Sequence, residues 1–111
     1  MAIVTGGGRG IGKAIAKLYA QEGAKVLVTY ERDDVSAQET LAEIRAAGGE
    51  SSLFKGDVSK ESDTKKMAEE AVRLFGGIHI LCANAATFHN AKIEDITEEN
   101  WDRVQAVNLK G

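Results

Sequence analysis

The sequence contains very little cysteine and no proline. Cys82 is the single cysteine among 111 residues, which excludes an internal disulfide and a cysteine-based zinc site. No proline, repeat or low-complexity linker marks a boundary between domains. We therefore expect one domain over residues 1–111, and the 43% of residues that are hydrophobic are enough to give it a core.

A basic stripe and a long apolar run are also missing. The 17 acidic residues outnumber the 14 basic ones and both signs are scattered, for a formal net charge of −3. Nucleic acid is therefore not expected as a partner. No apolar run approaches the roughly 20 residues of a membrane span, and no secretory signal precedes Thr5. We expect a cytoplasmic protein that does not bind membranes.

Glycine, by contrast, is concentrated near the beginning of the chain. The segment Thr5–Gly12 reads TGGGRGIG, and it lies between the apolar run Ala2–Val4 and the helix-forming residues Lys13–Leu18. This order predicts a strand, a tight turn and a helix whose first N–H groups are free to bind a phosphate. The segment therefore predicts a nucleotide site.

The apolar pattern alternates between short β-rich runs and helical spacing, which predicts an α/β fold with a parallel sheet. The expected strands are residues 2–5, 24–30, 51–55 and 78–83. The helices are expected to begin near Gly10, Ser36, Ser59 and Thr97, with Ser59 and Thr97 as N-caps.

Right-handed crossovers place these strands in the order 3-2-1-4, with helices on both faces of the sheet. A nucleotide is then expected between strands one and four, where the order reverses. Strand four lies at an incomplete edge, although the pattern of Ile78, Ile80 and Leu81 is typical of burial on both faces. We therefore expect something to cover that edge.

The spacing of the glycines narrows the kind of phosphate site. Gly7–Lys13 nearly matches the P-loop pattern G-x-x-x-x-G-K, but the next residue, Ala14, has no hydroxyl for a magnesium ion. A divergent P-loop nucleoside triphosphatase is one alternative. The segment Thr5–Gly12 also differs from the general dinucleotide pattern G-x-G-x-x-G. It resembles the T-G-x-x-x-G-x-G segment of the short-chain dehydrogenase/reductase family.

Three further segments match that family at its spacing, so the resemblance covers the whole chain and about the first half of a typical member. They are Asp57-Val58, the residues ANAA at 83–86, and the residues VNLKG at 107–111. The resemblance implies the N-terminal portion of a Rossmann fold that binds NAD(P). It also implies hydride transfer between nicotinamide and an alcohol or carbonyl substrate, and a homo-oligomer for the full-length protein.

The resemblance also implies roles for particular residues. The expected cofactor-binding residues are Gly6, Gly8, Arg9, Gly10, Ile11, Gly12, Arg32, Asp57, Val58, Asn84 and Ala85. Asp57 is expected to accept from the adenine amino group. Asn108 is the one expected catalytic residue, because the family's Asn kinks its helix and holds a water linked to the catalytic lysine. Ala83 and Ala86 depart from the family's N-N-A-G segment, which leaves the nicotinamide side less defined.

The residues alone allow simpler interpretations of three of these side chains. Asp57 is also typical of a turn or a helix cap, and Asn84 of a turn that ends a strand. Asn108 either braces the backbone, joins a polar network, or is a helix-terminal amide satisfied by solvent.

The type of nicotinamide cofactor is expected to depend on the end of the second strand. An acidic side chain there accepts from the ribose 2′-hydroxyl, whereas a basic one pairs with a 2′-phosphate. The family's usual acidic position corresponds to Thr29, while Arg9 and Arg32 are candidate phosphate partners and Glu31 would repel the phosphate. We expect NADP(H) in preference to NAD(H).

The family's reaction needs a Tyr-x-x-x-Lys pair and a serine that orients the substrate. Neither tyrosine fits, since Gly23 follows Tyr19 and Asp34 follows Tyr30 at the lysine position. We therefore expect these 111 residues to be the N-terminal half of an oxidoreductase, inactive alone. The other alternative is a complete, non-catalytic nucleotide-binding or interaction module that pairs through the edge of strand four.

Overall fold

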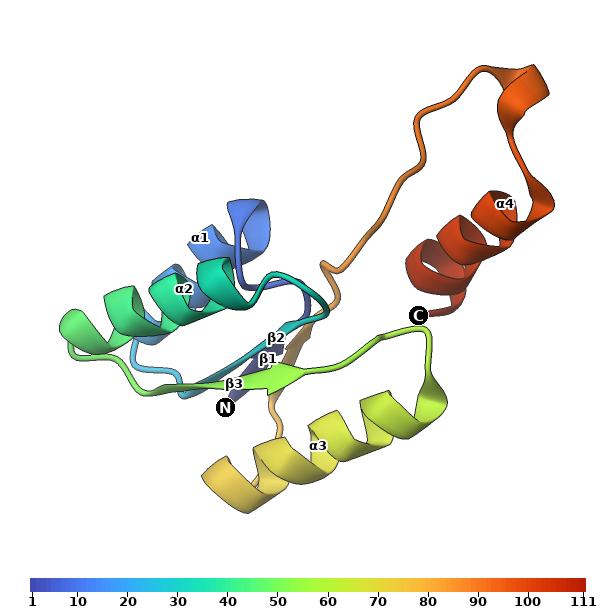
Figure 1. The fold of residues 1–111 in the computed structure, drawn as a ribbon. Coiled ribbons are helices and arrows are strands. Elements are labelled where there is room, and N and C mark those ends of the chain that lie inside the picture. Colours follow the sequence, from blue (N-terminus) through green and yellow to red (C-terminus); the bar gives the residue numbers. More distant parts are fainter.

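A computed structural model describes residues 1–111, which form a four-stranded parallel sheet with helices on both faces (Figure 1). The strands are β1 (Ala2–Val4), β2 (Val26–Tyr30), β3 (Ser51–Lys55) and β4 (Ile80–Cys82). They pair in the order β3-β2-β1-β4. The predicted α/β fold and strand order are confirmed, although β1, β2 and β4 are shorter than predicted.

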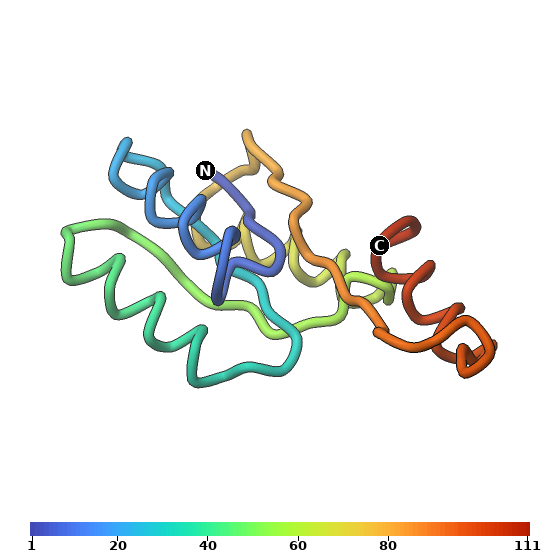
Figure 2. Tube along the Cα trace, turned by 90° about the horizontal axis from the view of Figure 1, so that it is seen from above, coloured from blue at the N-terminus to red at the C-terminus, as the bar shows by residue number.

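Three helices cover the two faces of the sheet, and a fourth lies away from it. They are α1 (Gly10–Gln21), α2 (Asp34–Ala46), α3 (Glu61–Phe75) and α4 (Glu98–Gln105), with a 3-10 turn η1 (Ile93–Asp95) and a π-helical segment η2 (Ala106–Lys110). Figure 1 shows α1 and α2 on one face and α3 on the other. The two views show α4 and η2 apart from the sheet, at the end of a long connector (Figures 1 and 2). No helix has both the length and the apolar character needed to cross a membrane.

Two helices begin at side-chain caps. Thr97 caps α4 as predicted, because its Oγ1 accepts the N–H of Asn100 at 3.2 Å. Helix α2 begins two residues before the predicted Ser36, because Asp33 is the cap and its Oδ1 accepts the N–H of Ser36 at 3.0 Å. An oxygen at this position satisfies one of the helix's otherwise unpaired N–H groups.

The prediction that Ser59 caps α3 is wrong. The helix begins at Glu61, and its N-cap position is Lys60, which makes no side-chain cap. Ser59 instead donates its N–H (2.9 Å) and its hydroxyl (2.6 Å) to Oδ1 of Asp57. An aspartate that binds the backbone two residues on forms a local turn, and this turn competes with the helix cap for the same serine.

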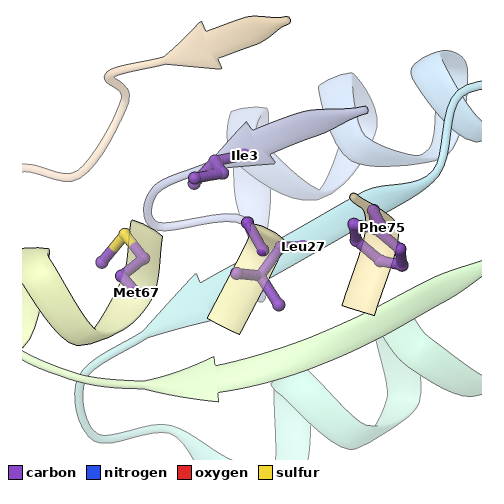
Figure 3. Packing of buried hydrophobic residues seen from close by; sticks show 5 residues of the cluster. Ile3, Leu27, Met67 and Phe75 are labelled. Atoms are coloured by element: carbon purple, nitrogen blue, oxygen red, sulfur yellow. The ribbon is translucent and has the colours of Figure 1, made fainter. Parts of the chain in front are cut away.

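The sheet is buried on both faces in its central strands. Leu27 of β2 is completely buried against α3, in a cluster with Ile3, Met67, Ala71 and Phe75 (Figure 3). The opposite face packs on α1 and α2 through a second cluster of Val4, Ala16, Val26, Val28 and Ile44. Since successive side chains of a strand point to opposite faces, β2 contributes to both clusters.

The apolar side chains of β4, and Ile78 shortly before it, are not buried as their pattern suggested. Ile78 and Ile80 are 39% and 40% exposed, and Leu81 is 63% exposed. The reason is that β4 pairs with β1 only, so its outer edge has no strand beside it. The incomplete edge is therefore as predicted, and burial of these side chains would require a partner for that edge.

An ion-pair network joins α1 to α2 and predicts a pH dependence of stability. Lys13 and Lys17 each donate to Glu43 at 2.8 Å. These bonds lower the pKa of Glu43 from 4.5 to about 2. A carboxyl whose pKa is lowered by folding stabilises the fold above its unfolded pKa and loses that contribution as the pH falls through the folded pKa. Stability should therefore fall between about pH 4.5 and pH 2.

Glu43→Gln is expected to reduce this acid dependence, since glutamine does not titrate. The free energy of unfolding is measured in urea at a series of pH values across this window. Glu39→Gln is the matched control on the same helix, because Glu39 is exposed and forms no ion pair. An acid dependence that is the same in both variants would contradict the assignment to Glu43.

Candidate functional site

A cleft of about 1060 Å³ opens where the strands end. The glycine turn after β1, the residues after β2, Gly56 and Val58 after β3, and the segment after β4 all line it, and α4 closes one side. Ten predicted cofactor-binding residues line the cleft: Gly6, Gly8, Arg9, Gly10, Ile11, Gly12, Arg32, Val58, Asn84 and Ala85. Asp57 and Asn108 lie outside this lining.

The glycines of the turn meet two different steric demands. A Cβ on Gly12 would collide with the carbonyl oxygen of Gly6 and would lie 2.6 Å from Nδ2 of Asn84. Gly10 has a φ of +57°, and apart from the adjoining residues and the backbone of α1 no atom lies within 4 Å of the position that a Cβ would take. Gly12 therefore permits a close approach of the chain to itself, whereas Gly10 leaves the cleft open.

The N-terminus of α1 carries free hydrogen-bond donors. The first helical bond runs from the N–H of Lys13 to the carbonyl of Arg9 at 3.1 Å, and the N–H groups of Ile11 and Gly12 have no partner. The helix has no side-chain cap and no acidic residue in its first turn. Unpaired N–H groups and the positive end of the helix dipole together favour an anion at this position.

Thr5 and Asn84 fasten the end of β4 to the glycine turn. Oγ1 of Thr5 accepts the N–H groups of Asn84 and Ala85, both at 3.0 Å. In return, Nδ2 of Asn84 donates to the carbonyl oxygens of Thr5 (3.0 Å) and Gly6 (3.3 Å). The Asn84 amide nitrogen therefore braces the glycine turn that follows β1, from its own position after the neighbouring strand β4.

Asp57 is held by neighbouring side chains. Its Oδ1 accepts both bonds from Ser59, and its Oδ2 accepts from Nη1 of Arg103 at 2.9 Å. Burial raises the pKa of Asp57, but the hydrogen bonds from Ser59 and Arg103 outweigh burial and keep the pKa below its usual range. Asp57 is therefore ionised near neutral pH and makes the contacts of a turn aspartate.

Asn108 lies in η2 and contacts the connector that follows β4. Its Oδ1 accepts the N–H of Thr87 at 2.8 Å, and its Nδ2 donates to the carbonyl of Thr87 at 2.7 Å. The backbone-bracing interpretation agrees with this geometry. The helical hydrogen-bond pattern changes from α to π at Ala106, next to Asn108. Thr87 lines the cleft, so Asn108 acts on the cleft wall through its partner.

The end of β2 presents charged groups rather than the side chain of Thr29, which is only 1% exposed. Oε1 of Glu31 accepts from Nη2 of Arg103 at 2.7 Å and lies 3.5 Å from Nε of Arg32. Nearby, Nη1 of Arg9 lies 3.7 Å from Oδ2 of Asp33, the residue after Arg32. The charged groups at this end of β2 therefore belong to exposed or half-buried side chains.

The sequence profile of a family described as short chain dehydrogenase matches residues 1–111. The chain belongs to the short-chain dehydrogenase/reductase family. It is 40% identical over its full length to a short chain dehydrogenase/reductase of Cryptosporiopsis sp., of which it covers 42%. It is 38% identical to the tetrahydroxynaphthalene reductase of Pyricularia oryzae, again over its full length, and covers 39% of that protein.

Solved structures of the short-chain dehydrogenase/reductase family share this fold. The crystal structure of a short chain dehydrogenase from Burkholderia cenocepacia J2315 in complex with NADP matches with a TM-score of 0.93 at 37% identity. The match covers 98% of this chain and 44% of that one. The chain thus spans about two fifths of the length of the curated relatives it matches. Its sheet and helices correspond to the N-terminal Rossmann part of the family's structures.

Several side chains that shape the cleft were not predicted from the sequence. Arg103 pairs with residues 46 and 72 positions away, and no local pattern signals such a contact. Thr40 is buried in α2, and its hydroxyl donates to the carbonyl of Gly8 at 2.8 Å. This bond ties the glycine turn to α2. The other cleft residues not predicted as binding residues include Tyr30, Thr87, Phe88, His89, Asn100, Val104 and Val107.

Proposed function

We propose that this protein is an NAD(P)-dependent oxidoreductase that transfers hydride between nicotinamide and an alcohol or carbonyl substrate. Residues 1–111 supply its dinucleotide site. The observation that carries the proposal is the pair of unpaired N–H groups on Ile11 and Gly12, beside the open space at Gly10. When bound, the cofactor supplies or accepts the hydride.

The cleft suits a dinucleotide in size and in charge. Its volume of about 1060 Å³ is at the large end of the range for small-molecule sites. Arg9 and Arg32 lie exposed on its rim, and the first turn of α1 carries no acidic side chain that would repel a pyrophosphate. The relative from Burkholderia cenocepacia, crystallised with NADP, gives independent support.

The chain's own residues divide the work of binding and positioning. The glycine turn would hold the pyrophosphate through its backbone N–H groups. Val58 lines the cleft and would contact the adenine ring. Asp57 lies outside this lining, and it would accept from the adenine amino group through lone pairs that its bonds to Ser59 and Arg103 leave unused. Asn108 would hold the cleft wall at Thr87 and, as in the family, a water near the reacting groups.

We infer a preference for NADP(H) over NAD(H) from the cleft rim. The side chains of Arg9 and Arg32 are 79% and 83% exposed, so they are free to turn toward a 2′-phosphate. Glu31, which would repel that phosphate, is already paired with Arg103 at 2.7 Å. A paired carboxylate opposes the phosphate less than a free one.

The P-loop alternative finds little support in the structure. A P-loop needs its lysine at the phosphates. Lys13, the residue at that position, donates to Glu43 at 2.8 Å instead and does not line the cleft. We therefore propose no nucleoside triphosphatase activity for this chain.

A second candidate function, an interaction module, rests on the edge of β4. Leu81 is 63% exposed and the outer edge of β4 is unpaired, which suits the addition of a strand from a partner. Light scattering and hydrogen exchange distinguish the two functions. A monomer whose β4 amides are protected from exchange would contradict pairing through this edge.

The proposed function is tested by binding rather than by turnover, because the chain has no Tyr-x-x-x-Lys pair. NADPH and NADH are titrated by fluorescence and calorimetry, with ATP and Mg²⁺ as a comparison. We expect saturable binding of the dinucleotides and none of ATP. Absence of binding for both dinucleotides would contradict the proposal.

A further inference from the structure

Arg103 of α4 bridges the turns that follow two different strands. Its Nη2 donates to Oε1 of Glu31 after β2, at 2.7 Å. Its Nη1 donates to Oδ2 of Asp57 and to Oγ of Ser59 after β3, both at 2.9 Å. The side chain of Arg103 is 33% exposed and that of Asp57 is 13% exposed, so this end of the bridge is partly shielded from solvent. The planar guanidinium can bind two carboxylates at once, which a lysine cannot do with the same geometry.

Because of this bridge, the cation nearest to the Glu31 carboxylate is Arg103 and not the adjacent Arg32. Oε1 of Glu31 lies 3.5 Å from Nε of Arg32, but only 2.7 Å from Nη2 of Arg103. The shorter contact is a charge-assisted hydrogen bond, whereas the longer one is an ion pair between exposed groups. Arg103 therefore neutralises Glu31 from the α4 side, and the donors of Arg32 remain available to a ligand. If Arg103 were absent, Arg32 would be the nearest partner of Glu31.

We propose that Arg103 is a specificity-determining residue for the cofactor, because its hold on Glu31 makes the end of β2 tolerant of a ribose 2′-phosphate. The proposal rests on the proposed function, since it requires that the cleft bind a nicotinamide dinucleotide. A free carboxylate at this end of β2 accepts from a 2′-hydroxyl and repels a 2′-phosphate. Arg103 is a positioning residue in this scheme: it acts through Glu31 and needs no contact with the phosphate.

The test compares NADPH and NADH binding to three variants of the purified protein by fluorescence titration at low salt. Arg103→Gln is expected to raise the Kd for NADPH about tenfold and to change that for NADH less than about twofold, because it frees one carboxylate charge near the phosphate. Adding Glu31→Gln to this variant removes the freed charge and should restore NADPH binding. Arg73→Gln, which breaks an ion pair with Glu70 on α3, is the matched control and should change neither Kd.

The double variant separates charge from damage to the fold. If Arg103→Gln only disturbed α4, then Glu31→Gln would not restore binding, and the proposal would be overturned. Equal weakening of NADPH and NADH, or no change for either, would overturn it too. If the unmodified protein bound neither NADPH nor NADH, the proposed function itself would be contradicted. The loss in Arg103→Gln should shrink at high salt, since a repulsion between exposed charges is screened.

Discussion

Gly10→Val is expected to abolish detectable binding of NADPH while leaving the chain folded. Beyond the adjoining residues and the backbone of α1, no protein atom lies within 4 Å of the position that a Cβ on Gly10 would take, so the added Cβ meets no distant part of the chain. It would instead fill the part of the cleft where the pyrophosphate is proposed to lie. The φ of +57° adds a backbone cost of about 1–2 kcal/mol for a residue with a Cβ.

Gly23→Val is the matched control for that cost. Gly23 also has a positive φ, of +90°, and it too has open space where a Cβ would project. It follows α1 at the end away from the glycine turn. Calorimetric titration should show normal NADPH binding in Gly23→Val and none in Gly10→Val, with similar losses of stability. Equal loss of binding in both would assign the effect to backbone strain, and unchanged affinity in Gly10→Val would remove the role of the turn.

Of the substitutions proposed here, Leu27→Ala should cause the largest loss of stability, a decrease of about 3 kcal/mol in the free energy of unfolding. Leu27 is 0% exposed in the second strand of the sheet and packs between Ile3 and the Met67 and Phe75 side chains of α3 (Figure 3). Truncation removes buried methyl groups and leaves a cavity that regular strands cannot collapse to fill. Urea unfolding measures the change, and the m value should stay the same because the surface exposed on unfolding changes little.

Leu18→Ala on α1 is the control for this substitution. The Leu18 side chain is 56% exposed, so the change in the free energy of unfolding should stay within about 0.5 kcal/mol. A loss in Leu27→Ala as small as that of the control would contradict the assignment of Leu27 to the core. Its position on β2 would then contribute less to holding α3 than the packing indicates.

The sequence predicted those features that depend on local periodicity and on topology rules. Alternating strands and helices, together with right-handed crossovers, were enough for the strand order. The predicted order 3-2-1-4 places the ends of strands one and four next to each other, and the glycine turn and Asn84, which follow these strands, do meet in the structure. The prediction that Ser59 caps α3 was wrong because capping a helix and closing a turn on Asp57 both suit a serine, and the local pattern does not separate the two uses.

Features that depend on distant partners were beyond local patterns. The topology rules predicted the unpaired edge of β4, but the apolar pattern of the strand suggested burial, and the exposure of Leu81 follows from the missing neighbour. Arg103 looks like any basic residue on a polar helix. Its partners Glu31 and Asp57 are brought together only by the parallel arrangement of β2 and β3, so its role appears once the two turns are placed side by side.

The pairing of β1 has a consequence for how the protein is made. Ala2 pairs with Val26 and also with Ile80, so one edge of β1 has no partner until β4 is synthesised, much later than β2. At about 5–20 residues per second, that delay amounts to several seconds on the ribosome. Asn84 arrives later still, and its bonds to Thr5 and Gly6 complete the turn. We therefore expect the nascent chain to expose a half-paired strand beside an incomplete glycine turn, and a chaperone that binds in this interval would protect it from aggregation.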